Sequence, residues 1–348
     1  MHQFVVDQLA TFSNLALIGV LVVTIIGLGK GADWLVDEAV SISIRSGIPS
    51  VIVGATIVSL GTTAPEAFVS VLAAVQGKPE LALGNAVGSI ICDTGLILGL
   101  ACVLAPLPFD RRIVSRQGWI QFGCGILLVA VCVPWNNPNQ IMKIGGMLHQ
   151  SVGWGFMVLL AVYLVWSIRQ TASVSDDAAG DASSAKSEVS GPLASSILKL
   201  VVAIAIVVVS ADVLIAAVEL IAQRLKIDRA IIAATLVAFG TSLPELVTAM
   251  TAVRKNQGEL AVGNIIGADI LNVLFVAGAA ASVTPLGLNA APFFFKLQFP
   301  AMILVLLIFR IGIFQARDNK LGRPLGVVLL LVYAVYLVLN FSMIGAKG

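Results

Sequence analysis

The sequence predicts an all-α polytopic membrane protein of about ten transmembrane helices, arranged as two inverted five-helix repeats. Its 348 residues are 58% hydrophobic and only 11% charged, with a mean hydropathy of +1.00, whereas roughly 25% of the residues of a soluble domain are charged. Several separate apolar runs reach the roughly 20 residues that an α-helix needs to cross about 30 Å of hydrocarbon. A long internal repeat then divides the chain into related halves.

Each apolar run is predicted to form one helix, because only helices or closed barrels satisfy their backbone within lipid. The first run continues into further spans after a short start with few basic residues, so no cleaved signal peptide is expected. The ten predicted helices cover residues 14–44, 48–76, 79–104, 117–134, 151–168, 194–223, 228–255, 258–283, 298–314 and 323–341.

The segment 171–192 differs in kind, because it is rich in small, polar and acidic residues. This composition predicts a flexible, solvated linker. The linker separates a first half, residues 1–170, from a second half, residues 193–348. Counted over the loops between the predicted spans, thirteen Lys and Arg lie on the side of the linker and seven on the other. Because basic loops stay inside, we expect a cytoplasmic linker and external termini in the inner (cytoplasmic) membrane.

Several function classes find little support in the sequence. Both histidines, His2 and His149, fall in predicted loops, and no metal-ligand spacing or nucleophile elbow occurs, so an enzyme is not expected. The net charge of +2 does not indicate nucleic-acid binding. The cysteines lie in or beside apolar runs without a pairing pattern, so they are predicted to be packing residues and not a disulfide framework. They are Cys92, Cys102, Cys124 and Cys132.

The internal repeat aligns residues 54–99 with residues 233–278 at a constant offset of 179, and 16 of the 46 aligned positions are identical. GTTAPE, which ends at Glu66, matches GTSLPE, which ends at Glu245. ELALGNAVGSIICD matches ELAVGNIIGADILN further along. Because Gly, Pro, Glu, Thr and Asn coincide, and not only Leu, Val and Ala, the segments are interpreted as a duplication. Five spans precede the linker, so the copies enter the membrane from opposite sides, as in secondary transporters.

The proline of each first motif is expected to interrupt its helix. Pro65 lacks a backbone donor and clashes with the carbonyl of Gly61, so the carbonyls of Ser59, Leu60 and Gly61 are predicted to lose their intrahelical partners. Such groups must face protein or a wet cavity. Together with nearby hydroxyls and carboxylates they form a set of hard oxygen donors, which Ca²⁺ and Na⁺ prefer. The side chains concerned are Thr62, Thr63 and Glu66 in the first copy and Thr241, Ser242 and Glu245 in the second.

The second motif of each copy places further polar residues inside a span. Ser89 and Asp93 share one helix face, and Ala268 and Asn272 occupy the same places in the second copy. Asp269 lies three residues before Asn272, on that face or at its edge. An acid at this depth costs roughly 2.5 to 3.5 kcal/mol even on translocon scales, so intramembrane acids are functional by default. The glycine pairs Gly84 and Gly88, and Gly263 and Gly267, are predicted to let another helix approach closely.

These paired motifs in two inverted halves resemble the α-repeats of the cation/calcium antiporter superfamily, the family of sodium/calcium exchangers, and within it the short prokaryotic members. The resemblance covers the 46 aligned residues of each half directly, and nearly the whole chain through the ten-span layout. It implies that Glu66 and Glu245 bind the transported cation. It also implies further ligands, which are the hydroxyls of Thr62, Thr63, Thr241 and Ser242, the carbonyls of Ser59 and Ala238, and the partner-helix positions Ser89, Asp93 and Asn272.

The sequence departs from the family pattern in three ways. The acid lies in the first copy, at Asp93, and the amide in the second, at Asn272, which reverses the common arrangement and leaves the placement of each Na⁺ subsite open. Ala268 lacks the hydroxyl of its mate Ser89. Asp269 replaces a common Asn, and its extra carboxyl is a candidate cation ligand or proton carrier.

The expected function is therefore antiport of Ca²⁺ against Na⁺ by alternating access, with Ca²⁺ efflux driven by Na⁺ entry. The first and sixth spans, matched at Asp33 and Asp212, are the expected sliding elements by resemblance to the family. Lys30 and these two acids are expected to line a water path or to lie in a polar interface. The alternatives are an H⁺/Ca²⁺ or K⁺-dependent exchanger and, in a different class, a gated cation channel. Ca²⁺ and Na⁺ would be substrates within the lipid bilayer, with no cofactor and with protein partners left open.

Overall fold

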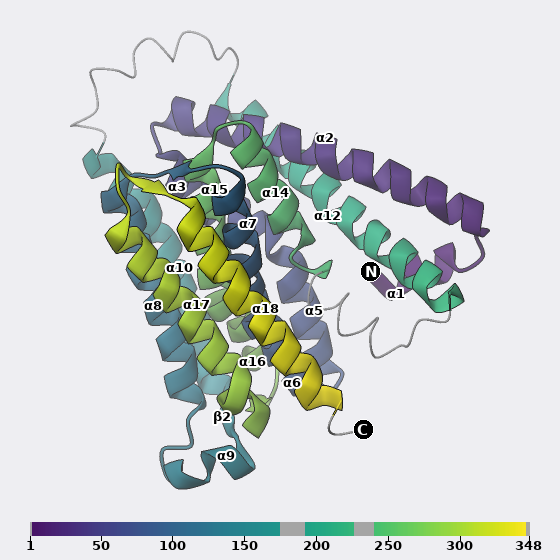
Figure 1. The fold of residues 1–348 in the computed structure, drawn as a ribbon, viewed down its shortest axis with the longest axis vertical. Coiled ribbons are helices and arrows are strands. Elements are labelled where there is room, and N and C mark those ends of the chain that lie inside the picture. Colours follow the sequence, from purple (N-terminus) through teal and green to yellow (C-terminus); the bar gives the residue numbers. More distant parts are fainter. Residues whose placement is uncertain (1, 175–191, 226–239, 346–348) are drawn as a thin grey trace.

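The protein forms a helical bundle of the size and apolarity of a membrane domain (Figure 1). The structure, a computed structural model, describes residues 2–174, 192–225 and 240–345. Within these ranges eight helices are long and apolar enough to cross a membrane, and a bent helix pair makes a ninth when counted as one span. The all-α polytopic fold is thus confirmed. Much of the predicted seventh span, 228–255, lies outside the described residues, as does most of the linker.

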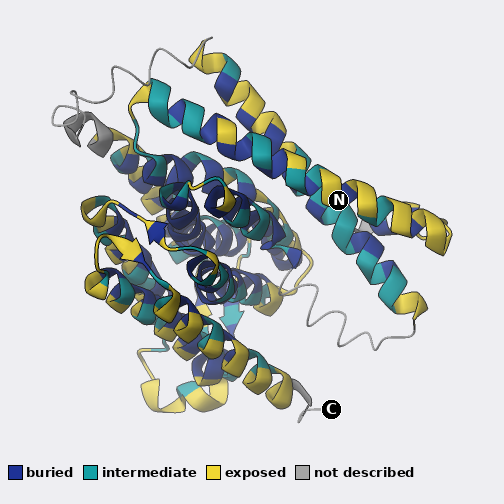
Figure 2. Ribbon diagram, turned by 45° about the horizontal axis from the view of Figure 1, so that its top comes forward, coloured by how far each residue is buried: buried dark blue, intermediate teal, exposed yellow. Residues whose placement is uncertain are grey.

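Two long antiparallel helices from the two halves of the chain stand at one side of the bundle (Figures 1 and 2). These are α2 (Asn14–Ser46) and α12 (Leu193–Arg224), which pack along each other. We call this pair the α2–α12 hairpin. Ser13 caps α2 by accepting a hydrogen bond from the backbone N–H of Ala16, and Gly47 ends it with φ 72°. The short α1 (His2–Leu9) packs against α12. The prediction that His2 lies in a loop was therefore wrong, whereas His149 lies between β2 and α10 as predicted.

The second span is broken at the first repeated motif. It consists of α3 (Ser50–Val53), the π-helical η1 (Gly54–Val58), α4 (Ser59–Thr62) and α5 (Ala64–Val75), and the chain bends by 43° between α4 and α5. Pro65 lies in the first turn of α5 and offers no N–H to the preceding turn, so the predicted break is confirmed. One detail was wrong, because the Ser59 carbonyl accepts a hydrogen bond from the Thr63 N–H at 2.8 Å.

The centre of the bundle consists of the second motifs of the two copies. The first copy forms α6 (Pro79–Ile90), η2 (Ile91–Ile97) and α7 (Leu98–Leu104). The second forms α15 (Gly258–Leu271), η4 (Asn272–Ala277) and α16 (Gly278–Ser282), preceded by α14 (Leu243–Arg254). The span that each copy forms here contains a π-helical stretch at a similar place, η2 in the first and η4 in the second. Such wide turns occur frequently at functional sites. The sequence pattern did not predict them.

Among the described residues, seven further helical segments and four short strands surround this centre. Asp110 caps α8 by accepting from the N–H of Ile113 at 2.9 Å, so α8 begins six residues before the predicted start at 117. Two antiparallel ladders, β1 with β4 and β2 with β3, were not predicted. The elements are β1 (Leu107–Pro108), α8 (Arg111–Cys132), η3 (Pro138–Gln140), α9 (Ile141–Ile144), β2 (Gly146–Leu148), α10 (Gln150–Val174), β3 (Leu288–Ala290), η5 (Phe294–Gln298), α17 (Phe299–Gln315), β4 (Lys320–Leu321) and α18 (Arg323–Gly345).

The two copies run in opposite directions through the bundle. β1, which follows α7, packs beside the start of α15, where Gly258 lies against Pro108. At the other face β3, which follows α16, packs on α6, and Asn289 Nδ2 donates to Glu80 Oε1 at 2.6 Å. The end of each copy therefore lies beside the beginning of the other. This is the antiparallel arrangement that inverted repeats require.

The glycine pairs behave differently in the two copies. A Cβ on Gly263 would collide with the backbone of Val51, and one on Gly267 would lie 2.5 Å from the Cα of Ala55. The predicted close approach is thus confirmed for the second copy, where α15 packs on α3, η1 and α4. Around Gly84 and Gly88 the described residues leave more room, but the segment equivalent to α3 and η1 in the second copy lies outside the described ranges.

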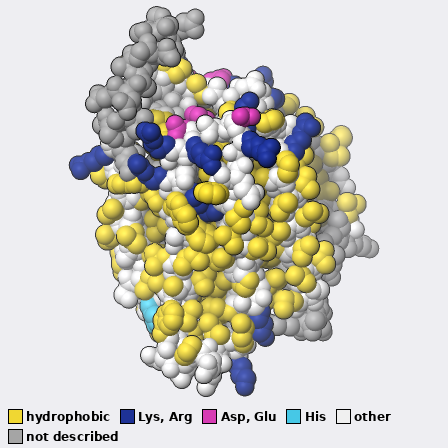
Figure 3. All heavy atoms as spheres, turned by 60° about the vertical axis from the view of Figure 1, so that its left-hand side comes forward, with side chains coloured by type: hydrophobic (Ala, Val, Ile, Leu, Met, Phe, Trp, Pro, Cys, Tyr) yellow, Lys and Arg dark blue, Asp and Glu magenta, His cyan; other side chains and the backbone are white. Residues whose placement is uncertain are grey.

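The surface is typical of a membrane protein. Exposed side chains cover the outer faces of the helices (Figure 2), and a broad apolar belt lies below a band of Lys and Arg (Figure 3). All four cysteines are free and buried, as predicted.

The contact at Gly267 yields a test of the packing. Gly267→Ala should lower the apparent melting temperature in detergent, because the new methyl group meets the backbone of η1 and the Ser59 hydroxyl at 2.5 Å. Overpacking of this kind costs about 1 to 3 kcal/mol. Gly123→Ala on α8 is the matched control, since nothing lies within 4 Å of its added Cβ. Equal melting temperatures for Gly267→Ala and the unmodified protein would contradict the close packing.

Candidate functional site

Four carboxylates converge at the centre of the bundle, and none is more than 2% exposed. Glu66 and Glu245 lie in the first turns of the half-helices α5 and α14, while Asp93 lies in η2 and Asp269 in α15. Thr63 in the first GT motif contacts Glu245, Asn272 contacts Asp93, and Thr94, the neighbour of Asp93, contacts Asp269. The structure thus brings together the four acids that the sequence indicated.

The two glutamates occupy equivalent places on the two broken spans. Each follows a proline in the first turn of a 12-residue helix, where the helix dipole favours negative charge. Thr63 Oγ1 donates to Glu245 Oε1 at 3.1 Å, which links the motif of one copy to the acid of the other. Glu245 Oε2 and both carboxylate oxygens of Glu66 have no hydrogen-bond partner among the other described residues. Three buried oxygens are therefore available to a ligand.

Asp93 and Asn272 form a pair across the two copies. They are 179 residues apart, the repeat offset, and Asn272 Nδ2 donates to Asp93 Oδ2 at 3.4 Å. Asp93 Oδ1 and Asn272 Oδ1 have no partner within the described part of the chain. The exchange of acid and amide between the copies therefore keeps one carboxylate and one amide together at the same point.

Asp269 is held from a different direction. Gln121 Nε2 on α8 donates to Asp269 Oδ2 at 2.5 Å, and Thr94 Oγ1 donates to the same oxygen. Gln121 also contacts Thr94 Oγ1 at 3.3 Å. Asp269 is therefore bound at the edge of the carboxylate cluster, toward α8, by two uncharged donors.

The other predicted ligands lie around these acids. Thr62 Oγ1 contacts the Ser59 carbonyl at 3.4 Å, and Thr241 Oγ1 contacts Asn85 Oδ1 at 3.4 Å. Ser59, Ser89 and Ser242 are buried. Ala238 lies outside the described residues, so its carbonyl is not placed.

Sequence reasoning missed Asn85 and Gln121. Asn85 Nδ2 reaches the Glu66 carbonyl at 3.4 Å and Ser70 Oγ at 3.0 Å, so this side chain connects both copies through Thr241. The available signal was that the Asn of the GN string occurs in both copies, as Asn85 and Asn264. The only signal for Gln121 in the sequence was a polar residue within an apolar run.

The mate of Asn85 has no such role. Asn264 is completely buried, yet neither its Nδ2 nor its Oδ1 has a hydrogen-bond partner among the described residues. The position equivalent to Ser70 is Ala249, which offers no hydroxyl. The two copies therefore share the glutamate and the asparagine of the repeated motifs but differ in the side chains around them.

A second polar group supports the first broken span from outside. Tyr163 on α10 places its hydroxyl 3.3 Å from the Ala55 carbonyl in η1 and 3.2 Å from Gln117 Oε1. Gln117 Nε2 in turn donates to Ser167 Oγ at 2.8 Å. Wide π-turns leave carbonyls poorly satisfied, so this contact stabilises the irregular backbone beside the site.

The donor set consists of oxygens from carboxylates, an amide and hydroxyls. Within the described ranges no three Asp, Glu, His or Cys side chains lie close enough to hold a metal ion alone. A bound cation would thus need hydroxyl, amide or carbonyl oxygens in addition to the acids. Hard cations such as Ca²⁺ and Na⁺ match such a set.

Comparison with known proteins gives a consistent result. The family model described as sodium/calcium exchanger protein matches residues 16–169 and 195–342. The inner membrane protein YrbG of Escherichia coli is 32% identical over 324 residues, covering 92% of this chain and 95% of YrbG. The sodium/calcium exchanger MaX1 of Methanosarcina acetivorans is 29% identical over 345 residues, covering 92% and 97%. A solved structure of the sodium-calcium exchanger NCX_Mj, soaked with Na⁺ and Sr²⁺, superposes with a TM-score of 0.76 at 26% identity, covering 94% and 99%.

The Asp269 contact predicts a stability effect. Gln121→Met should lower the apparent melting temperature, because it leaves a buried carboxylate without one of its two donors, a loss worth about 1 to 3 kcal/mol. The double variant Gln121→Met/Asp269→Met should recover much of this loss, since both partners are then apolar. Gln140→Met, at an exposed position, is the control. If Gln121→Met melted no lower than the double variant, the loss of the Gln121 donor to the buried Asp269 carboxylate would not be the cause of any destabilisation.

Proposed function

Because the chain belongs to the sodium/calcium exchanger protein family, we propose that it is a secondary active antiporter that exchanges Ca²⁺ for Na⁺ across the cytoplasmic membrane. The observation that carries the proposal is the cluster of buried acids. Within the described residues no Lys, Arg or His forms an ion pair with Glu66, Asp93, Glu245 or Asp269. Buried charges require a partner, and a transported cation supplies it.

The proposed binding site comprises Glu66, Glu245, Asp93 and Asn272. Their unpartnered oxygens, with the hydroxyls of the two GT motifs, are the ligands in this proposal. Ca²⁺ and Na⁺ compete for the same oxygens, and competition couples their movements. The empty, charged site is costly to bury, so the surrounding helices change conformation when cations neutralise it.

Alternating access is the proposed mode of movement. The α2–α12 hairpin is the proposed moving part, because it stands beside the bundle while the carboxylates lie on the central helices (Figure 1). In inverted-repeat transporters one bundle moves against the other around a fixed site. Na⁺ entering down its gradient would then drive Ca²⁺ outward.

One observation favours a proton-coupled variant of this exchange. Asp269 adds a fourth carboxylate, and the two side chains that donate to it, Thr94 and Gln121, are uncharged. A carboxyl in such a place carries charge only at a cost, so it is the candidate proton carrier if H⁺ replaces Na⁺. The name YrbG specifies no ion, whereas MaX1 and NCX_Mj are named as sodium/calcium exchangers.

We further propose that the linker is cytoplasmic. α8 begins with Arg111, Arg112 and Arg116 at the end of the molecule where α10 ends (Figure 1), and Figure 3 shows a band of Lys and Arg at one end of the molecule. A basic face of this kind faces the cytoplasm. The termini would then be external.

Transport is tested by uptake of radiolabelled Ca²⁺ into proteoliposomes. Vesicles loaded with Na⁺ and diluted into Na⁺-free buffer should accumulate Ca²⁺, and Glu66→Gln should reduce the rate by at least about tenfold, because a charged ligand is lost. Glu80→Gln, the matched control, removes an exposed carboxylate at the start of α6 and should leave uptake unchanged.

The other outcomes separate the alternatives. Uptake that requires a pH gradient and not Na⁺ would indicate that H⁺ is the counter-ion. Asp269→Asn would then be the next variant to measure. Uptake without any counter-ion would indicate a channel. Normal uptake by Glu66→Gln would contradict the assignment of the site.

Orientation has a separate test. Ser184→Cys in the linker should react with a membrane-impermeant maleimide only after permeabilisation. Asn137→Cys, exposed at the opposite end, should react in intact right-side-out vesicles. The native cysteines are buried and should contribute little label. The reverse pattern would place the linker outside.

A further inference from the structure

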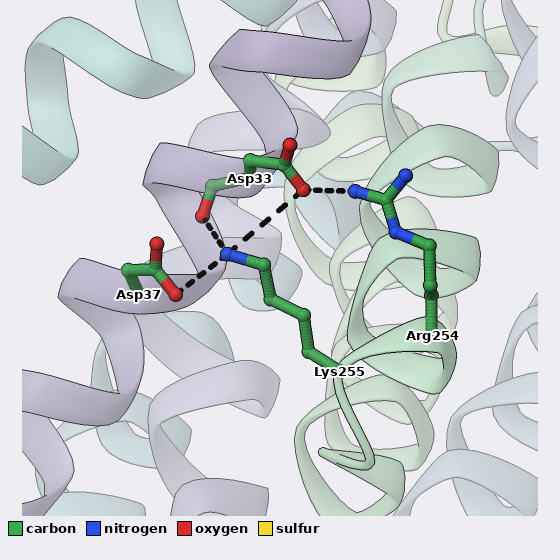
Figure 4. A network of polar contacts seen from close by, with 4 residues as sticks. All are labelled: Asp33, Asp37, Arg254 and Lys255. Atoms are coloured by element: carbon green, nitrogen blue, oxygen red, sulfur yellow. Dashed lines mark hydrogen bonds and ion pairs between the residues drawn. The ribbon is translucent and has the colours of Figure 1, made fainter.

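A cluster of ion pairs connects the α2–α12 hairpin to one end of α14 (Figure 4). Lys255 Nζ lies 2.6 Å from Asp37 Oδ1 and donates to the backbone carbonyl of Asp33 at 2.9 Å. The same nitrogen lies 3.9 Å from Asp33 Oδ1, to which Arg254 is also paired. Two acids of α2 are thus bound by two adjacent bases. We call these four residues the α2–α14 latch.

The position of the latch relates it to the carboxylate site. Arg254 is the last residue of α14, and Glu245 lies in the first turn of the same helix. Nine residues of α-helix span about 14 Å, so the latch and the site are connected by one short, rigid rod. Any sliding of α2 along α14 must break or rearrange these ion pairs.

The latch has no counterpart at the other face of the molecule. Under the repeat offset Asp33 corresponds to Asp212, but Asp37 corresponds to Ala216. Arg254 and Lys255 correspond to Val75 and Gln76, which are uncharged. A second pair within the hairpin, Lys199 with Glu38 at 3.7 Å, corresponds to Val20 and Ala217. The duplication therefore has a full set of charges on the linker side only.

The packing of the two long helices against the half-helices also differs between the two faces. α2 packs closely along α14, whereas the symmetry-related helices, α12 and α5, meet at most at their edges. Asn85 is likewise hydrogen-bonded while its mate Asn264 is not. Under the alternating access proposed above, exchanging the roles of the two halves predicts a second conformation, in which α12 packs against α5. This structure would then be the first of the two.

We propose that the α2–α14 latch holds the hairpin on the linker-side end of α14 and so biases the transporter toward this conformation. The proposal rests on the alternating access proposed above. The exchanged conformation has no equivalent ion pairs, because Val75 and Gln76 would face α12 there. The latch is therefore a charge device that makes the two otherwise similar conformations unequal in population.

The strength of the latch suits a reversible contact. The side chains of Asp37 and Arg254 are 63% and 66% exposed, and those of Asp33 and Lys255 are 31% and 27% exposed. Solvent and salt weaken such pairs, which prevents the latch from locking the protein permanently. We expect it to change the ratio of the two conformations on the order of fivefold.

The test measures conformation directly by double electron–electron resonance in proteoliposomes. Spin labels at Val23→Cys on α2 and Leu104→Cys on α7 report movement of the hairpin against the centre, since both positions are exposed and the native cysteines are buried. Lys255→Ala should raise a second distance population on the order of fivefold. High salt should do the same in the unmodified protein and have less effect in Lys255→Ala.

Two further variants make the test specific. Lys78→Ala removes an exposed lysine at the equivalent turn on the opposite face and should leave the distances unchanged. Asp37→Lys and Lys255→Glu should each shift the distances, and their combination should restore part of the original distribution, because the pair between positions 37 and 255 re-forms while the contacts of Lys255 with Asp33 stay lost.

Unchanged distances in Lys255→Ala, or an equal shift in Lys78→Ala, would contradict the proposal that the latch biases the conformation. Because the measurement requires no transport, a failure of Na⁺/Ca²⁺ exchange would appear separately, as absent uptake with the distance shift intact.

Discussion

The burial of negative charge at the centre of a membrane-spanning bundle is the constraint on which the rest of the structure depends. Four carboxylates lie out of contact with solvent, and several of their oxygens have no partner within the described residues. Removing an ion from water costs several kcal/mol even after relaxation. A stable fold must therefore compensate these charges with dipoles, hydrogen bonds or bound cations.

Broken helices provide part of this compensation. Glu66 and Glu245 each lie in the first turn of a half-helix, where the unpaired N–H groups give a partial positive charge. Neutral donors supply another part, as Thr63 does for Glu245. Neither can balance four charges fully, because dipoles and hydroxyls contribute only fractions of a charge. In the proposed function, a transported cation would make up this deficit.

The sequence was sufficient for the fold class and for the acids, because both depend on strong local signals. A run of about 20 apolar residues has few alternatives to a transmembrane helix, and an intramembrane glutamate beside a repeated proline has few structural uses. The contacts of Gln121 and Tyr163 depend instead on how α8 and α10 pack against the centre, which no local pattern encodes. The π-turns were missed for a related reason, since they arise from tertiary packing around Asp93 and Asn272.

The differences between the two copies follow a physical order. Some positions that offer oxygen are kept in both copies, as with Glu66 and Glu245, or exchanged, as with Asp93 and Asn272, whereas Ala268 lacks the hydroxyl of Ser89. Positions that only support them have diverged, as with Ser70 and Ala249, because a supporting contact can be replaced by other packing. In the proposed function a cation at the centre would contact both copies at once, so a change in one copy would alter the whole site. The ion pairs of the α2–α14 latch join the two halves at one face, whereas the positions equivalent to Arg254 and Lys255 at the other face, Val75 and Gln76, carry no charge.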